Sequence, residues 1–296
     1  MRQPGFFSPR ERGFTLIELA IVIAILGFLL VLLVGISTSL VGQQRREATR
    51  TRLVNAEVAL ALFVSQNQRL PCPANGALAS GDALAGLERM TGSNCSVQGA
   101  APNQTGGVLP WRTLGLSEAD ATDGWGSRLT YRVTPELVAA AALNFTNCDP
   151  GATRAGTATA SCAAGCPTGT FPSGCTHPAD VLIGKGLRIE DLNGNPLMSV
   201  GAAGATAVTS TAAAYVLISH GENRDGGYSD VGAVQAAAGL DSGTKEAENK
   251  GDRAYQATYY DGLPSYASGP GHFDDFVVRP TILSLIVKAQ LGPRAH

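Results

Sequence analysis

One glutamate, Glu18, stands at the start of a long apolar run. No charged residue occurs from Leu19 through Gln44, and a bilayer span takes about 20 mostly apolar residues. A carboxylate at membrane depth is costly and is by default a functional residue. The arginines Arg2, Arg10 and Arg12 precede the run, which predicts a cytoplasmic N-terminus and export of the rest of the chain. The alternative is a plain signal anchor in which the glutamate is incidental.

The side chains that could perform catalysis form no known catalytic pattern. Neither a G-x-S-x-G nor an H-E-x-x-H motif lies near the four histidines, which are His177, His220, His272 and His296. Ser219, His220 and Asp225 supply the residue types of a catalytic triad, but closeness in sequence does not give triad geometry. We therefore predict that the chain is not an enzyme.

Oxygen donors gather in two late segments of the sequence. These donors are Glu222, Asn223, Asp225, Asp230, Asp274 and Asp275. Hard cations such as Ca²⁺ bind several oxygens from flexible loops, although acidic glycine-rich loops are more often solvated turns. The segment from Asp191 to Asn195 also has calcium-like spacing, but it lacks the closing glutamate of an EF-hand, so we expect a β-turn there.

The elements that position these residues begin with a helix. No proline occurs between Phe14 and Leu70, so one helix of some 50 residues, about 75 Å long, could span this stretch. Pro71 and Pro73 end it. Its second half is amphipathic, and the apolar side expected to pack on the globular domain comprises Val54, Val58, Ala61, Leu62 and Ser65.

The remainder of the chain reads as a domain of short strands. Glycine accounts for 36 of the 296 residues, and a net charge of 22 − 24 = −2 argues against a nucleic-acid binder with a broad basic surface. The strand candidates are 128–133, 181–183, 187–189, 215–219 and 276–278, with a terminal helix or strand at 281–290 and a low-complexity loop at 150–176. The predicted fold is α+β: a long N-terminal hydrophobic helix packed on an antiparallel β-sheet domain with long loops.

The run from Arg12 to Glu18, together with the apolar stretch after it, resembles the class III leader of type IV pilins and type II secretion pseudopilins. The resemblance implies cleavage by prepilin peptidase after Gly13, N-methylation of the new N-terminal residue Phe14, and a requirement for Glu18 in filament assembly. Cleavage would leave an amine at Phe14 that a neighbouring subunit's Glu18 could neutralise, so the pair would act as a check on assembly. Gly35 stands near the place where many pilins carry a proline.

Weaker similarities extend into the globular domain. The run from Asp123 to Gly126 is similar to the turn before the sheet in major pseudopilins, and the segments 215–227 and 274–276 resemble that group's last strands and loop. Because major pseudopilins bind calcium in the corresponding loop, the resemblance implies Ca²⁺ as a candidate cofactor, with Asp225, Asp274 and Asp275 as candidate ligands. The mature chain would have 296 − 13 = 283 residues, which favours a minor or enlarged pseudopilin-like subunit.

The six cysteines are predicted to form disulfides, because export places the domain in an oxidising compartment. They are Cys72, Cys95, Cys148, Cys162, Cys166 and Cys175. Six cysteines allow 15 pairings, and local pairing would join Cys72 to Cys95. A zinc site formed by the last four cysteines and His177 is the alternative, but the C-x₂-C spacing of common zinc sites is missing.

These inferences predict a filament subunit with a leader at 1–13, a transmembrane and filament-core helix at 14–44, an amphipathic stalk helix at 45–70 and a periplasmic globular α+β domain at 71–296. Its expected location is the bacterial inner membrane, as a single-pass protein, and then the filament. Its expected partners are other pilin or pseudopilin subunits, prepilin peptidase and the inner-membrane assembly platform. Secretion pseudopilus and type IV pilus both remain open, and the alternative is a monomeric membrane-anchored periplasmic binding protein or enzyme.

Overall fold

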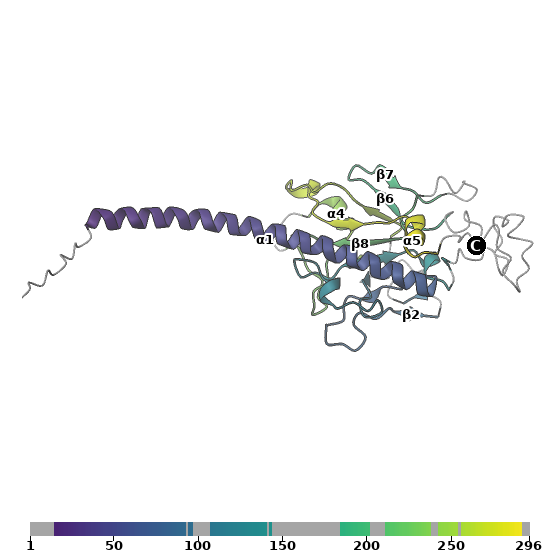
Figure 1. Cartoon of the computed structure of the whole chain (residues 1–296). Coiled ribbons are helices and arrows are strands. Elements are labelled where there is room, and N and C mark those ends of the chain that lie inside the picture. The colour runs from purple at the N-terminus through teal and green to yellow at the C-terminus, as the bar shows by residue number, and fades with distance from the viewer. Residues whose placement is uncertain are drawn as a thin grey trace, which may run out of the picture. The chain divides into compact units, whose positions relative to one another are not determined.

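The computed structural model describes residues 15–92, 94–96, 107–140, 142–143, 184–201, 211–237, 242–253 and 256–291, without the side chains of 30–39 and 94. The chain divides into two compact units, residues 1–46 and 47–296. Helix α1 (Leu16–Asn67) contributes its first part to the first unit and its second part to the other (Figure 1). The predicted long helix is therefore confirmed, with bounds slightly inside those expected from the prolines.

The first unit consists, where it is described, of the apolar part of α1. Its side chains from Leu16 to Leu29 are exposed, with exposed fractions such as 88% for Leu16 and 67% for Phe28. Such a surface is unfavourable in water and is stable only against lipid or other protein. Within the described residues, we find no helix that combines the length and the apolar character needed to cross a membrane.

The second unit is built on a five-stranded antiparallel sheet in the order β1-β4-β5-β8-β10. The strands are β1 (Ala74–Asn75), β4 (Gly107–Val108), β5 (Thr130–Val133), β8 (Tyr215–Ser219) and β10 (Phe276–Val278). The apolar runs at 215–219 and 276–278 form the strands predicted for them, and 128–133 contributes β5. The prediction of an α+β fold with an antiparallel sheet is confirmed.

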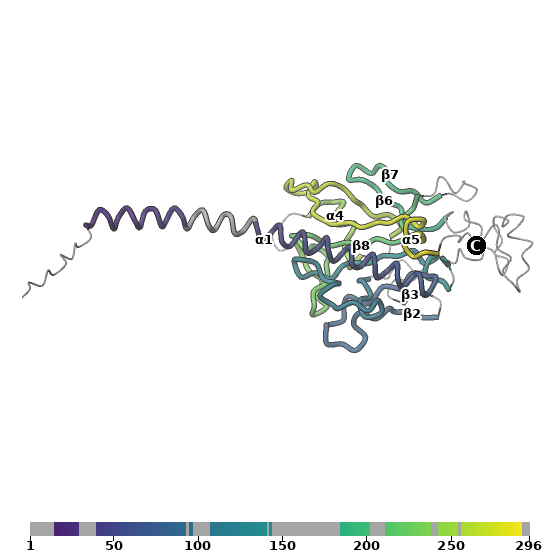
Figure 2. Tube along the Cα trace, viewed as in Figure 1, coloured from purple at the N-terminus to yellow at the C-terminus, as the bar shows by residue number. Residues whose placement is uncertain are grey.

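Smaller elements surround this sheet (Figure 2). A second sheet joins β7 (Pro196–Met198), β6 (Arg188–Glu190) and β9 (Thr258–Tyr260), with β6 and β9 parallel, and a hairpin pairs β2 (Met90–Thr91) with β3 (Asn94–Cys95). The short helices in the described part of the chain are α4 (Thr244–Glu248), α5 (Ile282–Lys288), η1 (Ala119–Ala121), η2 (Pro135–Leu137) and η4 (Gly269–Gly271). The segment 281–290 is thus a helix, begun by Thr281, whose hydroxyl accepts a hydrogen bond from the Ser284 amide.

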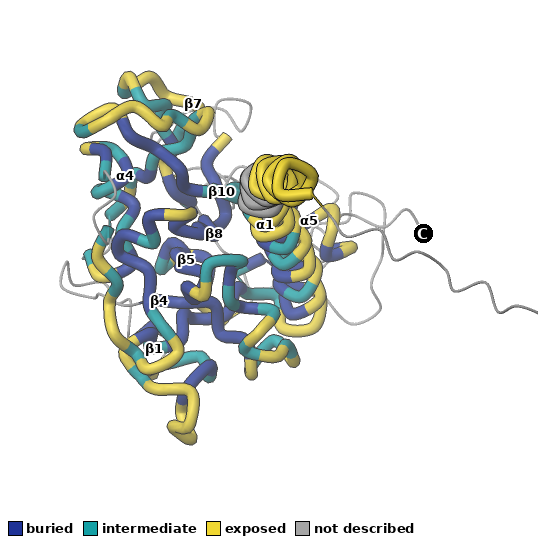
Figure 3. The backbone as a smooth tube through the Cα atoms, turned by 90° about the vertical axis from the view of Figure 1, so that its left-hand side faces the viewer, coloured by how far each residue is buried: buried dark blue, intermediate teal, exposed yellow. Residues whose placement is uncertain are grey.

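Strand β8 is buried on both faces, as its continuous apolar sequence requires (Figure 3). Tyr215 and Leu217 belong to the larger core, which also contains buried side chains from the second part of α1 and from α5. Val216 and Ile218 belong to a second core formed with β6, β7 and β9. The strand therefore separates two apolar layers, and its end at Ser219 delivers the following residues into the interior.

The buried side of α1 differs from the one expected from its sequence. Val54, Val58 and Leu62 are 55%, 63% and 58% exposed, so the prediction that they pack on the globular domain is wrong. The side that packs on the sheet comprises Thr49, Leu53, Ala56, Leu60, Ala61, Phe63 and Val64. The helix carries apolar residues on both sides, so spacing alone did not identify the one that the sheet covers.

Candidate functional site

The first candidate site is the beginning of α1. The Glu18 carboxylate accepts hydrogen bonds from the Thr15 amide and hydroxyl, both at 2.9 Å, and the Thr15 hydroxyl accepts one from the Glu18 amide at 3.3 Å. This reciprocal arrangement is a capping box, which satisfies backbone amides that a helix start leaves unpaired. Glu18 therefore has a structural use within its own chain. Gly13 and Phe14 lie outside the described residues.

The second candidate site is a buried polar cluster where β8 ends. It draws on the turn before β5, the loop after β8, helix α4 and the segment that leads into β10. Its members are Asp123, Ser219, His220, Asn223, Glu246, His272, Asp274 and Asp275, all buried. Such a concentration of buried ionisable groups is uncommon unless the charges are paired or bind a ligand.

Asp123 fixes the turn that the sequence predicted before β5. Its Oδ1 accepts hydrogen bonds from the amides of Trp125 and Ser127, and its Oδ2 accepts one from the Ser219 hydroxyl at 2.6 Å. Burial raises the pKa of Asp123 above its ordinary value despite these hydrogen bonds. Ser219 therefore donates to Asp123 and not to His220, and the Ser219–His220–Asp225 triad is not formed.

His220 lies between a hydroxyl and a carboxylate. Its Nε2 is 2.8 Å from the Thr130 hydroxyl, and its Nδ1 is 3.6 Å from an Asp275 carboxylate oxygen. Burial alone would lower the pKa of His220, but the interactions with Asp275, Asp123 and Glu246 together outweigh it and raise the pKa. Burial likewise raises the pKa of Asp275. The order hydroxyl, imidazole, carboxylate matches a catalytic triad, but Thr130 and His220 are fully buried, so a substrate cannot reach them in this conformation.

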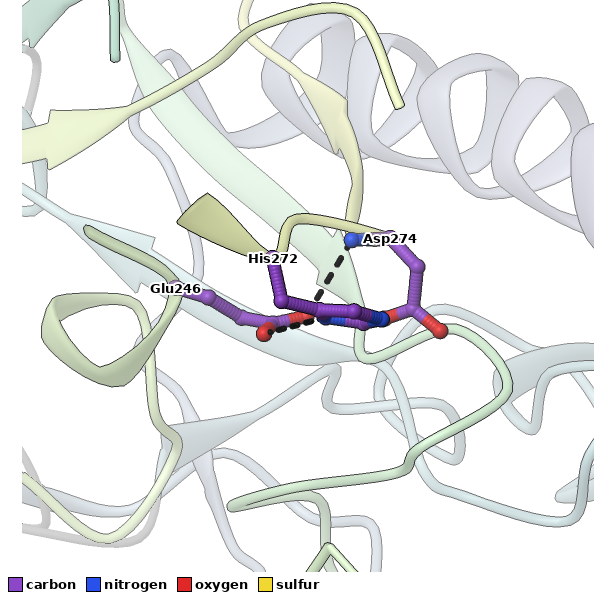
Figure 4. A group of neighbouring side chains, drawn as sticks. All are labelled: Glu246, His272 and Asp274. Atoms are coloured by element: carbon purple, nitrogen blue, oxygen red, sulfur yellow. Dashed lines mark hydrogen bonds and ion pairs between the residues drawn. The ribbon is translucent and has the colours of Figure 1, made fainter. Parts of the chain in front are cut away.

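Glu246, His272 and Asp274 form the most compact part of the cluster (Figure 4). One ligand atom of each lies within 4.8 Å of those of the other two, and His272 Nδ1 is 3.0 Å from Glu246 Oε2. Glu246 also accepts hydrogen bonds from the Gly243 and Asp274 amides. Together with the contacts to Asp274 and His272, these bonds outweigh burial and lower the pKa of Glu246, whereas burial and Glu246 raise the pKa of Asp274 to about 7.

Two glycines permit this close packing. Gly221 has φ +56°, and a Cβ there would lie 2.4 Å from the Asp274 carbonyl oxygen. A Cβ at Gly243 would collide with the His272 carbonyl oxygen. Because the loop after β8 can approach so closely, the amides of Glu222 and Asn223 both donate to Asp274 Oδ2.

The three candidate calcium ligands occupy different pairings. Asp225 forms an ion pair with Lys250 at 2.8 Å, and Asp275 accepts a hydrogen bond from the Asn249 side chain and faces His220. Only Asp274 belongs to the compact group with His272 and Glu246. Calcium binding by Asp225, Asp274 and Asp275 stays a prediction. The segment 191–195 forms the expected turn, in which Asp191 accepts hydrogen bonds from Asn193 and Asn195.

Sequence reasoning missed Glu246 altogether and considered His272 only as an isolated histidine. The one local signal for Glu246 was its place three residues after Gly243 at a helix start, where an acidic residue caps the amides. Its contact with residues 272 and 274 depends on how α4 packs beside η4, which no local pattern encodes. The sequence therefore could not show that these three residues meet.

Cys72 and Cys95 form a disulfide, which is the local pairing considered for them. It ties the segment after α1 to strand β3. The other four cysteines, the alternative zinc ligand His177 and the strand candidate 181–183 lie outside the described residues.

Comparison with known proteins gives one match, at the N-terminus. No curated protein and no solved structure matches the chain significantly. Residues 8–34 match the family described as the prokaryotic N-terminal methylation motif. These residues include Gly13, Phe14 and Glu18 and the first part of α1. The chain carries, at its N-terminus, the signature of type IV pilins and pseudopilins.

Proposed function

We propose that this protein is a structural subunit of a type II secretion pseudopilus or a type IV pilus. Prepilin peptidase cleaves it after Gly13, Phe14 is N-methylated, and the subunit assembles through its N-terminal helix. The observation that carries the proposal is the methylation motif at residues 8–34. The motif includes Glu18, which lies in the first turn of α1. Proteins with this motif are typically structural rather than enzymatic.

The exposed side chains of the first part of α1 support the proposal. Apolar residues point in all directions around the helix from Leu16 to Leu29, as expected for a segment surrounded first by lipid and then by neighbouring helices. On this basis residues 1–13 are a leader, 14–44 the membrane and filament-core helix, 45–70 the stalk, and 71–296 a periplasmic domain. The precursor is anchored in the inner membrane, and its partners are other subunits, the peptidase and the assembly platform.

The first test is the intact mass of the protein extracted from membranes of cells with and without prepilin peptidase. We expect a chain that begins at methylated Phe14 only when the peptidase is present. A chain that begins at Met1 in both strains would refute the proposal and favour a static anchor, in which the globular domain does the work.

The second test separates the two uses of Glu18. Glu18→Gln keeps a side chain that can complete the capping box with Thr15, but it removes the negative charge. Thr15→Val removes the cap's hydroxyl and keeps the charge. If the charge neutralises the amine of a neighbouring subunit, Glu18→Gln abolishes recovery of the protein in sheared filaments while Thr15→Val largely preserves it.

The opposite pattern would refute the assembly role. Incorporation lost in Thr15→Val and retained in Glu18→Gln would mean that Glu18 matters only for starting the helix. Membrane levels of each variant, measured in parallel, show whether the loss reflects assembly or degradation.

A further inference from the structure

The buried group Glu246, His272 and Asp274 contains more negative charge than its surroundings neutralise. Among the described residues, the ion pairs of these two carboxylates involve His272 alone, since Lys250 pairs with Asp225 and His220 faces Asp275. Exposed fractions of 0% for Glu246, 9% for His272 and 4% for Asp274 leave little room for solvent to screen the charges. Two carboxylates in such a place require a proton or a cation between them.

A second observation points to a cation. Asp274 Oδ1 is buried and finds no hydrogen-bond partner among the described residues, although Oδ2 of the same carboxylate accepts two backbone amides. Figure 4 shows the side chains of Glu246 and Asp274 converging on the imidazole of His272. Buried polar atoms are normally satisfied, so an orphan carboxylate oxygen beside a convergent imidazole and carboxylate suggests that a ligand belongs there.

The donor types indicate which cation fits. Ca²⁺ and Mg²⁺ are bound by oxygens, whereas an imidazole nitrogen with two carboxylate oxygens suits Zn²⁺ and similar first-row ions. Two ligands at about 2.1 Å on a tetrahedral zinc lie about 3.3 Å apart. His272 Nδ1 and Glu246 Oε2, at 3.0 Å, are already close to that separation, and the largest separation in the group, within 4.8 Å, would contract by up to about 1.5 Å on binding.

We propose that Glu246, His272 and Asp274 bind a divalent transition-metal ion, with Zn²⁺ as the best fit. Three protein ligands leave one position of a tetrahedral ion for water. One ligand comes from α4 and the other two come from the segment between η4 and β10, so the ion joins two separate pieces of chain. Because the group is buried, the ion's role is to brace these segments rather than to act on a substrate.

The test uses the full chain purified in detergent, stripped with a chelator and then titrated with Zn²⁺ alone. We expect one tightly bound zinc per chain and a rise in the melting temperature. His272→Gln removes the imidazole and should weaken zinc binding by more than about 100-fold, beyond the effect typical of residues that only orient ligands. His220→Gln is the matched control, since it changes a buried histidine of the same cluster outside the group and should retain zinc.

A second measurement keeps the proposal falsifiable if His272→Gln fails to fold. X-ray absorption at the zinc edge of the unmodified protein should show one imidazole and oxygen ligands. Sulfur ligands would place the ion at cysteines and overturn the proposal. A melting temperature that rises with Ca²⁺ and not with Zn²⁺ would also overturn the proposal. A melting temperature that responds to neither ion would overturn it too, and would mean that the two carboxyl groups share a proton instead.

Discussion

Two leucines on the second part of α1 offer a direct test of which side of the helix packs on the sheet. Leu60 is fully buried in the main core, whereas Leu62 is 58% exposed. Leu60→Ala removes buried methyl groups and leaves a cavity, which costs about 3 to 5 kcal/mol of unfolding free energy. Leu62→Ala should change it by less than about 0.5 kcal/mol. Both changes alter helix propensity equally, so the difference of about 3 to 5 kcal/mol isolates burial.

The assay is urea unfolding of the full chain in detergent, followed by tryptophan fluorescence. Trp111 and Trp125 both belong to the globular unit, so their signal reports its unfolding. With a slope of about 2 kcal/mol per molar urea, the midpoint of Leu60→Ala should fall by about 1.5 to 2.5 M and that of Leu62→Ala should hardly move. Equal shifts, or a larger shift for Leu62→Ala, would refute the packing of the Leu60 side of α1 on the sheet and would favour the side that sequence spacing predicted.

Three further predictions concern the globular unit. Replacing both cysteines of the Cys72–Cys95 disulfide by alanine should lower the free energy of unfolding, measured with urea, by about 3.4 kcal/mol. This is the entropy that the unfolded chain loses when a disulfide links two residues 23 positions apart. The neighbouring carboxylates, Asp275 foremost, raise the pKa of His220 above its ordinary value of 6.5. The stability that this interaction contributes is therefore present below pH 6.5 and lost as pH rises through the folded-state pKa. Metal-free protein should accordingly melt at a lower temperature in alkaline buffer. Arg128→Ala should cost about 1 to 3 kcal/mol, as measured by thermal melting, since it removes a buried guanidinium that pairs with the partly exposed Glu118 and leaves carbonyl groups without their donors.

Each of these has a result that would contradict it. If the variant without Cys72 and Cys95 were as stable as the disulfide-bonded parent protein, the disulfide would contribute nothing to the free energy of unfolding. A pH profile equally steep in His220→Gln would assign the slope to other groups. An Arg128→Ala variant with unchanged melting would mean that the guanidinium's hydrogen bonds to the Gly76 and Leu78 carbonyls contribute nothing net.

The sequence alone determined the features that depend on neighbouring residues. The long helix α1 follows from a proline-free stretch, and its end follows from Pro71 and Pro73. Strand β8 was predicted with its observed bounds because five successive apolar or small residues between turn signals favour a buried strand. The methylation motif could be recognised in the same way, since Gly13, Phe14 and Glu18 are close together in the chain.

Only the tertiary structure decided the features that depend on distant residues. The second part of α1 has apolar residues on two sides, and the sheet covers the one that contains Leu60 rather than the one that contains Leu62. Glu246 meets His272 and Asp274 across 26 and 28 residues of chain, and Asp225 turns to Lys250 instead. Side-chain spacing within one element says nothing about which other element will pack against it, because that choice depends on the free energy of burying whole surfaces together.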